Sequence, residues 1–204
     1  MTTESTPQNS WQRLREGNGR FVEGTTSHPN QDAFRRESLV NTQHPFAVIF
    51  GCSDSRLAAE IIFDVGLGDV FVVRTAGQVI DDAVLGSLEF STVELGVPLI
   101  VVLGHDSCGA VTATRDAVQT GQMPPGFLRD LVERITPSVL TSIRNEETEI
   151  NQMVSEHVKQ TSKRLVDSSR LISKAVDEGT VAVIGVTYHL EDGRAEIVSG
   201  AESL

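Results

Sequence analysis

Residues 46–56 read FAVIFGCSDSR, an apolar run that passes directly into a polar turn. Consecutive apolar residues without alternation are typical of a parallel strand that helices cover on both faces. Residues 70–73 and 99–103 repeat this pattern, and a helical pattern follows each of the three runs. The order of apolar runs and helical patterns therefore predicts βα units around a parallel sheet.

The C-terminal part of the chain predicts two further strands. Residues 181–186 form another apolar run, and the Asp192-Gly193 turn leads from it to a short run at 195–198. An Asp-Gly pair between two such runs is a strong hairpin signal, so the last strand is expected to be antiparallel, at an edge. The predicted fold is α/β, with a central mostly parallel β-sheet, an antiparallel edge strand and helices on both faces.

The residues before the first strand predict an N-terminal helical arm, 1–45. Asn9 or Ser10 is expected to cap a first helix, and a second helix is expected over about 32–41. We expect this arm to pack on a partner subunit. The length of the chain fits a single domain, 1–204, that includes the arm.

Between residues 127 and 178 the pattern is helical and rich in polar residues. Breaks are expected near Asn145 and at Pro137, because proline removes a backbone donor and clashes with the preceding turn. Gly179 is expected to stop the last helix, since glycine readily adopts the left-handed conformation found just after helices. We expect these helices at the edge or on the surface of the sheet.

Composition excludes several classes of protein. The 17 Lys and Arg residues against 28 Asp and Glu give a net charge of −11, which excludes a simple nucleic-acid binder because such proteins need a basic surface. No apolar run approaches the ~18 residues that cross a bilayer, so no membrane partner is expected. The polar N-terminus and the presence of only two cysteines favour a cytoplasmic protein.

A helix expected over residues 82–95 carries two apolar rows on nearly opposite sides. One row is Leu85, Leu88, Thr92 and Leu95, and the other is Ala83, Gly86, Phe90 and Val93. Burial within a large monomer is one explanation for the second row. Contact with another subunit is favoured, because a one-domain chain has little else to cover that row.

Two cysteines and one histidine follow the ends of predicted strands. Cys52 follows the first strand, and His105 and Cys108 follow the strand at 99–103. Because the carboxyl ends of parallel strands meet at one edge of a sheet, these side chains form a plausible Zn²⁺ ligand set. Two buried cysteines beside a core histidine are the structural alternative. With three soft ligands, a bound zinc keeps a fourth position for water or a carboxylate, which is typical of catalytic sites.

Three motifs resemble, in order and spacing, those of the β-class carbonic anhydrases. They are FGCSDSR at 50–56, FVVRTAGQ at 71–78 and GHDSCGA at 104–110. The resemblance covers about residues 11–121, including the early arm at 11–21, and continues more loosely through the terminal strands. The combination of C-S-D-S-R with H-x-x-C is its most specific part.

The resemblance implies one Zn²⁺ per chain, held by Cys52, His105 and Cys108. It also implies that Asp54 and Arg56 form a hydrogen-bonded catalytic pair beside the fourth position. A paired Asp54 accepts a hydrogen bond from the zinc-bound hydroxide, whereas an unpaired Asp54 ligates zinc itself in a closed state.

The substrate pocket is a further implication of the resemblance. Gln43 matches a glutamine that contacts substrate, Phe71 an aromatic lining residue and Ala76 a small apolar wall. Phe90 matches a position where relatives often carry tyrosine and which the partner subunit contributes. The resemblance thus implies a homo-oligomer, dimer or tetramer, with the active site at the subunit interface.

The implied function is zinc-dependent reversible hydration of carbon dioxide to bicarbonate and a proton by a zinc-bound hydroxide. A first alternative is hydrolysis of a related small molecule, such as carbonyl sulfide or carbon disulfide, on the same zinc scaffold. A second is a noncatalytic, redox-responsive zinc protein, against which Asp54 and Arg56 argue. The sequence does not separate the first two functions, because they differ in pocket access.

Overall fold

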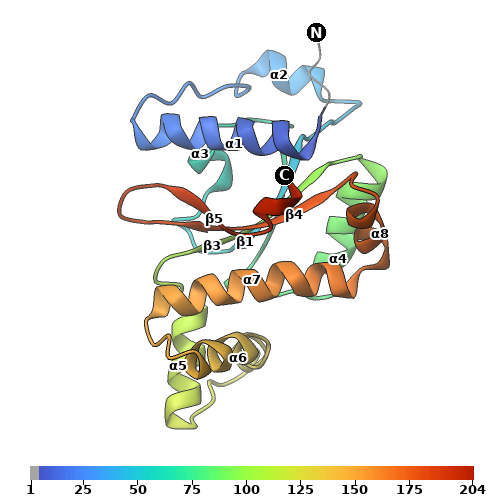
Figure 1. The fold of residues 1–204 in the computed structure, drawn as a ribbon. Helices are drawn as coiled ribbons and strands as arrows, with labels where there is room; N and C mark the ends of the chain where they lie inside the picture. Colours follow the sequence, from blue (N-terminus) through green and yellow to red (C-terminus); the bar gives the residue numbers. More distant parts are fainter. Residues whose placement is uncertain (1–4) are drawn as a thin grey trace.

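A five-stranded sheet with helices on both faces forms the centre of the computed structural model, which describes residues 5–204 (Figure 1). The strand order is β2-β1-β3-β4-β5, and every neighbouring pair is parallel except β4 and β5. The predicted mostly parallel sheet with an antiparallel edge is therefore confirmed. The strands are β1 (Ala47–Cys52), β2 (Val70–Thr75), β3 (Leu99–His105), β4 (Ala182–Tyr188) and β5 (Ala195–Ser199).

The three middle strands β1, β3 and β4 are buried along their whole length, as their unbroken apolar sequences predict. Strand β2 differs from the expectation of cover on both faces, because most of its residues are only half-buried. The reason is its place in the sheet, since β2 lies at an edge and has a neighbour on one side only. An apolar run alone does not distinguish an edge strand from a central one.

Helices α1 (Pro7–Val22) and α3 (Ala59–Ile62) lie over one face of the sheet, with α2 (Ala33–Ser38) beyond them (Figure 1). The expected cap of the first helix was wrong: Thr6 is the N-cap, its hydroxyl accepts from the Asn9 N–H, and proline follows it at the first helical position. Trp11 and Leu14 of α1 pack into the core of their own chain. Contact between this arm and a second copy stays a prediction, and residues 1–4 of the arm lie outside the described part.

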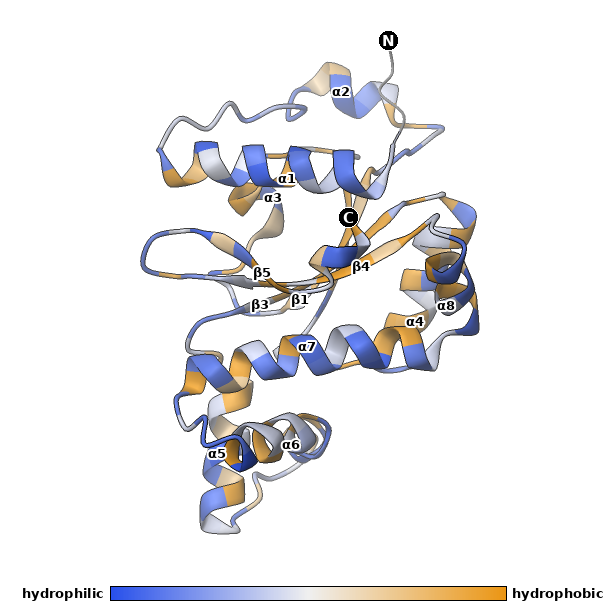
Figure 2. Cartoon of the chain, viewed as in Figure 1, coloured by the Kyte–Doolittle hydropathy of each residue, from blue (hydrophilic) through white to orange (hydrophobic). Residues whose placement is uncertain are grey.

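The opposite face of the sheet is covered mainly by α7 (Ile150–Ser168) and α4 (Asp82–Glu89), with α8 (Arg170–Asp177) beside them (Figure 1). Helices α5 (Gly109–Thr120) and α6 (Leu128–Arg144) pack on each other beyond α7. In the hydropathy view, the central strands are mostly apolar, whereas α1 and α7 alternate between polar and apolar residues along their length (Figure 2). The elements thus bury a continuous core on each side of the sheet.

The expected break at Pro137 is wrong, because α6 continues through this proline to Arg144. Pro137 is exposed, so the backbone acceptor left without its usual helical donor is on a solvated side of the helix. The stop near Asn145 is confirmed, since Asn145 is the C-cap of α6. Gly179 follows the C-cap of α8 with φ +70°, which confirms its expected role.

The helix expected over 82–95 begins as α4 and continues as a π-helical turn, η2 (Phe90–Glu94). Leu88 and Thr92 of the first apolar row are buried against the sheet. In the second row, Phe90 and Val93 are 46% and 54% exposed. Residues 5–204 leave Phe90 and Val93 about half uncovered, and contact of this row with another subunit stays a prediction.

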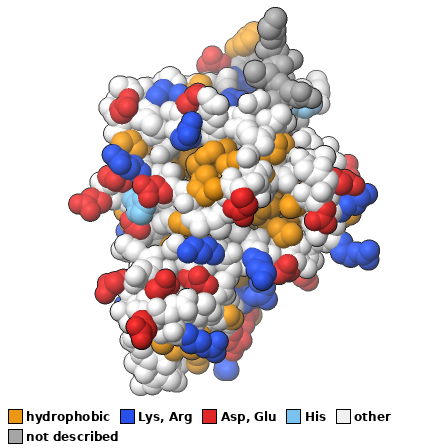
Figure 3. Space-filling model, in the orientation of Figure 1, with side chains coloured by type: hydrophobic (Ala, Val, Ile, Leu, Met, Phe, Trp, Pro, Cys, Tyr) orange, Lys and Arg blue, Asp and Glu red, His pale blue; other side chains and the backbone are white. Residues whose placement is uncertain are grey.

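The surface on the side shown in Figure 3 mixes charges of both signs around a central group of apolar side chains, between α1 and α7. Beneath it lies the edge of the sheet formed by β5, whose residues are mostly half-buried. Among residues 5–204, no helix has the length and apolar character needed to cross a membrane.

Candidate metal centre

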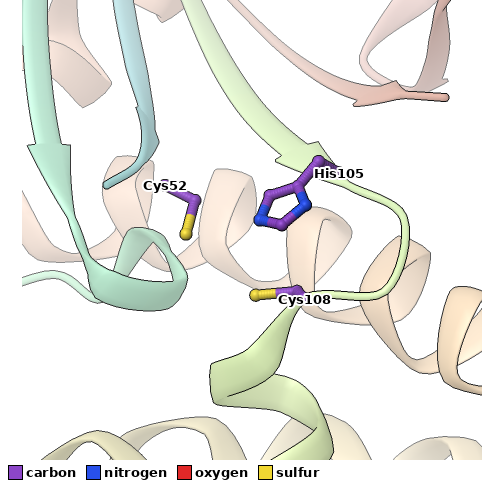
Figure 4. A group of neighbouring side chains, drawn as sticks. All are labelled: Cys52, His105 and Cys108. Atoms are coloured by element: carbon purple, nitrogen blue, oxygen red, sulfur yellow. The ribbon is translucent and has the colours of Figure 1, made fainter. Parts of the chain in front are cut away.

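Cys52, His105 and Cys108 meet at the carboxyl edge of the sheet (Figure 4). Cys52 ends β1, His105 ends the adjacent strand β3, and Cys108 is the N-cap of α5. Their sulfur and ring nitrogen atoms lie within 4.8 Å of one another, and all three residues are buried. The parallel pairing of β1 with β3 brings the distant Cys52 to the other two, as their positions in the sequence predicted.

The histidine ring offers one nitrogen to the centre of this group. His105 Nδ1 lies 2.9 Å from the Asp106 backbone oxygen, an acceptor, so the proton of the neutral ring is on Nδ1. His105 Nε2 is buried and has no hydrogen-bond partner among the described residues. A buried unpaired nitrogen is costly unless it binds something, and two soft sulfur donors face it. The three donors therefore fit Zn²⁺, whose tetrahedral sites place such ligand atoms about 3.5–4 Å apart.

The two thiols of the site do not share one protonation state. The neighbouring Cys108 thiol lowers the pKa of Cys52 despite its burial, and His105 and the Gly77 N–H lower it further. The same pairing raises the pKa of Cys108, and burial raises it further. Burial acts to lower the pKa of His105, but the nearby Cys52 sulfur and its negative charge raise it overall. The site thus already stabilises a thiolate, which is the form that binds metal.

Asp54 lies beside these donors and is held by Arg56. The guanidinium donates from Nε to Asp54 Oδ1 at 2.9 Å and from Nη2 to Oδ2 at 2.7 Å, and the Arg56 backbone N–H also donates to Oδ1 at 2.9 Å. These bonds hold the pKa of Asp54 well below its usual range, so it is a carboxylate at neutral pH. Asp54 Oδ2 lies 3.7 Å from His105 Nε2, which places a negative charge next to the candidate site.

Two contacts of the site come from residues that sequence reasoning did not single out. Arg74 donates to the backbone oxygens of Cys52 and Asp54, at 2.9 and 2.6 Å, and so fixes the loop between them. Gly77 donates its backbone N–H to Cys52 Sγ at 3.2 Å. Arg74 could have been found from the sequence, because it is a charged residue inside an otherwise apolar strand. The contact of Gly77 could not, because a backbone N–H has no counterpart in the pattern of side chains.

The four residues expected to form the substrate pocket do not lie together in a single chain. Ala76 stands next to Gly77 in the short helix η1 (Ala76–Gln78), beside the metal centre. Gln43 instead lines a separate cleft of about 610 Å³ with Leu95, at the end of the segment that carries Phe90. The structure therefore does not bring Gln43 to the cysteines of its own chain.

The two aromatic residues of the expected pocket lie together. The ring centroids of Phe71 and Phe90 are 6.3 Å apart. Phe71 pairs with Val48 in the sheet, and Cys52 pairs with Thr75, so Phe71 is four residues, roughly 13 Å, back along the strand from the metal centre. Within one chain these rings line a surface away from the candidate site.

The fold and this donor set define an α/β protein with a candidate transition-metal centre at the edge of its sheet. The sequence matches the family model described as carbonic anhydrase over residues 47–195. It is 53% identical to the carbonic anhydrase of Mycolicibacterium smegmatis over 96% of this chain and 95% of that protein. It is 54% identical to carbonic anhydrase 2 of Mycobacterium tuberculosis, over 93% of this chain and 91% of that one.

Solved structures agree with these matches. The β-carbonic anhydrase CcaA has a TM-score of 0.74 at 26% identity, with 93% of this chain and 87% of that chain covered. A tetrameric β-carbonic anhydrase of Sordaria macrospora has the same fold, with a TM-score of 0.72 at 22% identity over 93% and 96% of the two chains. The chain belongs to the β-class carbonic anhydrase family, whose members are lyases, carbonate dehydratases.

Proposed function

We propose that this protein catalyses the zinc-dependent reversible hydration of carbon dioxide to bicarbonate and a proton. The observation that carries the proposal is the buried, unpartnered His105 Nε2 facing two cysteine sulfurs, because that arrangement has three soft donors for one metal ion. Membership in the carbonic anhydrase family supplies the reaction. One zinc per chain is part of the proposal.

Cys52, His105 and Cys108 would hold the metal, and Asp106 fixes the ring of His105 through its backbone oxygen. Zinc bound there supplies a Lewis acid that lowers the pKa of a coordinated water, which gives a nucleophile near neutral pH. Asp54, a carboxylate kept in place by Arg56, would accept a hydrogen bond from the nucleophile and so orient it toward the substrate carbon.

The Arg56 contacts also keep Asp54 from binding the metal. Asp54 Oδ2 is 3.7 Å from His105 Nε2, so a carboxylate oxygen is close enough to the three donors to compete for a metal held there. Two bonds from the guanidinium and one from the backbone oppose that binding. We propose that Asp54 alternates between this open arrangement and a closed one in which it is the fourth ligand.

A second copy of the chain completes the pocket in this proposal. Gln43, Phe71 and Phe90 lie away from the metal centre of their own chain, and Phe90 is 46% exposed. An aromatic pair on a surface suits a small uncharged substrate such as carbon dioxide when a neighbouring subunit presents its metal centre there. We propose a dimer or tetramer of single-domain subunits with the site at their interface, in the cytoplasm, where two free thiols stay reduced.

The test combines metal analysis with stopped-flow hydration of carbon dioxide. The wild-type protein is expected to hold about one zinc per chain and to be active. Cys108→Ser is expected to lose metal and activity together, because a hydroxyl is a far poorer zinc ligand than a thiolate. The neighbouring Ser107→Ala, which keeps both sulfurs, is the matched control and should resemble the wild type.

Full zinc occupancy in Cys108→Ser would refute the ligand assignment. A zinc-loaded wild-type protein that does not hydrate carbon dioxide would refute the proposed reaction. In that case carbonyl sulfide and carbon disulfide, assayed with the same samples, are the next substrates on the same scaffold.

A further inference from the structure

His157 is a buried histidine on α7 that the proposed reaction does not use. Its ring is 4% exposed and makes two hydrogen bonds, Nδ1 with Ser138 Oγ at 2.9 Å and Nε2 with the Gly77 backbone oxygen at 2.8 Å. Burial lowers the pKa of His157 to about 4, so the ring is neutral at neutral pH. Because a carbonyl oxygen only accepts, Nε2 carries the proton and donates it to Gly77. Nδ1 then accepts from the Ser138 hydroxyl, whose single proton is shared with Gln160 Oε1 at 3.2 Å.

The backbone that His157 contacts has an uncommon conformation. Gly77 has φ +65° and ψ +25°, and Gln78 follows with φ +42°, so two successive residues are left-handed. This conformation costs a residue other than glycine about 1 kcal/mol or more and persists where its surroundings enforce it. The Gln78 side chain does not hold the turn, since neither of its amide atoms has a partner among the described residues. The carbonyl bound by His157 belongs to the peptide that joins the two residues.

Gly77 connects this turn to the metal centre. Its N–H donates to Cys52 Sγ at 3.2 Å, from the other side of the same Cα that bears the carbonyl held by His157. The fit is tight, because a Cβ on Gly77 would lie 2.9 Å from both the Ala110 Cβ and the Ile135 Cδ1. Both contacts are made in the left-handed turn, where ψ of Gly77 aims its carbonyl at His157 and φ aims its N–H at the sulfur.

We propose that His157 is a positioning residue for Cys52: it holds the Gly77 carbonyl, fixes the left-handed turn and so keeps the Gly77 N–H on the sulfur. The inference rests on the proposed function in that Cys52 is taken as a zinc ligand. A hydrogen bond to a thiolate withdraws electron density from the sulfur, so the sulfur donates less charge to the metal. Loss of that bond makes a bound zinc a weaker Lewis acid and moves the pH dependence of catalysis to higher pH.

Two substitutions separate the contacts of the imidazole. The amide of glutamine reaches about as far as Nε2, so His157→Gln keeps a donor for Gly77. The amide of asparagine reaches only as far as Nδ1, so His157→Asn keeps the Ser138 contact and loses the Gly77 contact. Both replacements are neutral amides at one site in the same helix, so they perturb the fold similarly. Thr161→Val, a buried change one turn further along α7, is the control for the helix itself.

Three measurements report on the inference. In His157→Asn, but not in His157→Gln or Thr161→Val, we expect faster hydrogen exchange of the Gly77 amide by NMR. We also expect zinc transfer to a chelator to accelerate roughly tenfold, because the lost orientation of Cys52 outweighs the stronger charge donation of its freed sulfur. Third, the midpoint of the kcat–pH profile should move to higher pH.

Equal Gly77 exchange and equal zinc release in the two variants would overturn the inference. The proposed function fails separately, if the wild-type protein holds no zinc. Gly77 exchange in the metal-free protein then still compares the two variants, and equal exchange there rejects the positioning role.

Discussion

Two donors of the candidate metal centre, His105 and Cys52, are oriented by backbone groups of other residues. Asp106 fixes the ring of His105, and the Gly77 N–H contacts Cys52. Asp54 differs from them, since a single flexible side chain, Arg56, supplies two of its three contacts. Arg56 is half-exposed and Asp54 is mostly covered, so this pair is the part of the centre best able to change its arrangement.

Arg56→Ala tests that arrangement. Without the guanidinium, Asp54 is expected to bind the metal, so kcat should fall by about tenfold or more while zinc stays bound. Two thiolates also make a coordinated water less acidic than at a three-histidine site, so wild-type activity should rise above pH ~7. In stopped-flow assays, the kcat of Arg56→Ala should stay low even at alkaline pH.

The control for this change is Arg115→Ala, which removes a half-buried arginine that pairs with Asp116 outside the site. A crystal structure of Arg56→Ala should show the Asp54 carboxylate on the metal. Wild-type kcat across the pH range, with water on the metal, would show that Arg56 is a structural residue only.

At the scale of elements, the segment formed by α4 and η2 has a buried face and an uncovered one. Leu88 is fully buried against the sheet, whereas Phe90 and Val93 are about half-exposed. Phe90 also contacts Phe71 of β2, the edge strand next to it. An apolar row beside an open sheet edge is typical of a surface that another chain covers.

Phe90→Asp is expected to weaken subunit association and activity together. The substitution places a charge in a face that we propose is buried between subunits, where an unpaired charge costs several kcal/mol. Sedimentation velocity measures the assembly and stopped-flow assays measure the activity of the same sample. Phe127→Asp is the control, because Phe127 is 89% exposed and precedes α6, outside this face.

An active Phe90→Asp variant with wild-type sedimentation would contradict both the interface and the role of Phe90 in the pocket. Loss of activity without dissociation would mean that Phe90 lines the pocket but does not contribute to the free energy of subunit association.

Across the whole molecule, Asp64 joins segments that are distant in sequence. The carboxylate follows α3 and accepts from Arg20 of α1 at 2.6 Å, and from the backbone N–H groups of Ser27 and His28 at 3.0 and 2.9 Å. Burial acts to raise the pKa of Asp64, but these bonds lower it well below its usual range. The arm is thus tied to the body of its own chain by a buried charge.

Asp64→Asn is expected to reduce the free energy of unfolding by about 3 kcal/mol at pH 7. The NH₂ group of the amide would face groups that are themselves hydrogen-bond donors, and Arg20 would lose its negatively charged partner. The folded pKa of Asp64 lies below the unfolded value of ~3.9, so its contribution is complete above that value. As the pH falls through the lower, folded pKa, wild type and variant should converge. Urea unfolding at several pH values measures this difference.

The comparison substitution is Asp116→Asn, which affects an exposed ion pair with Arg115 and should change stability by about 0.5 kcal/mol or less. A stability difference between wild type and Asp64→Asn that persists unchanged at pH 2–3 would show that the effect does not come from the charge of Asp64.

The sequence by itself determined the strands of the buried sheet and the three residues that form the candidate metal centre. Unbroken apolar runs mark β1, β3 and β4, because a strand covered on both faces has no polar side. Cys52, His105 and Cys108 follow directly from the ends of such strands, so the parallel order of the sheet was sufficient to bring them together. The local pattern of apolar residues and the order of the strands along the chain were therefore enough to predict both the sheet and the three donor residues.

Only the tertiary structure decided what surrounds those donors. His157 reaches Gly77 across 80 positions, and its contact depends on the packing of α7 against the sheet, which no local pattern encodes. The half-exposure of β2 depends on its place at the edge, and the continuation of α6 through Pro137 depends on which side of that helix faces solvent. Hydrogen bonds to the backbone and the exposure of a strand or helix face depend on neighbours distant in sequence, and these are fixed only when the chain has folded.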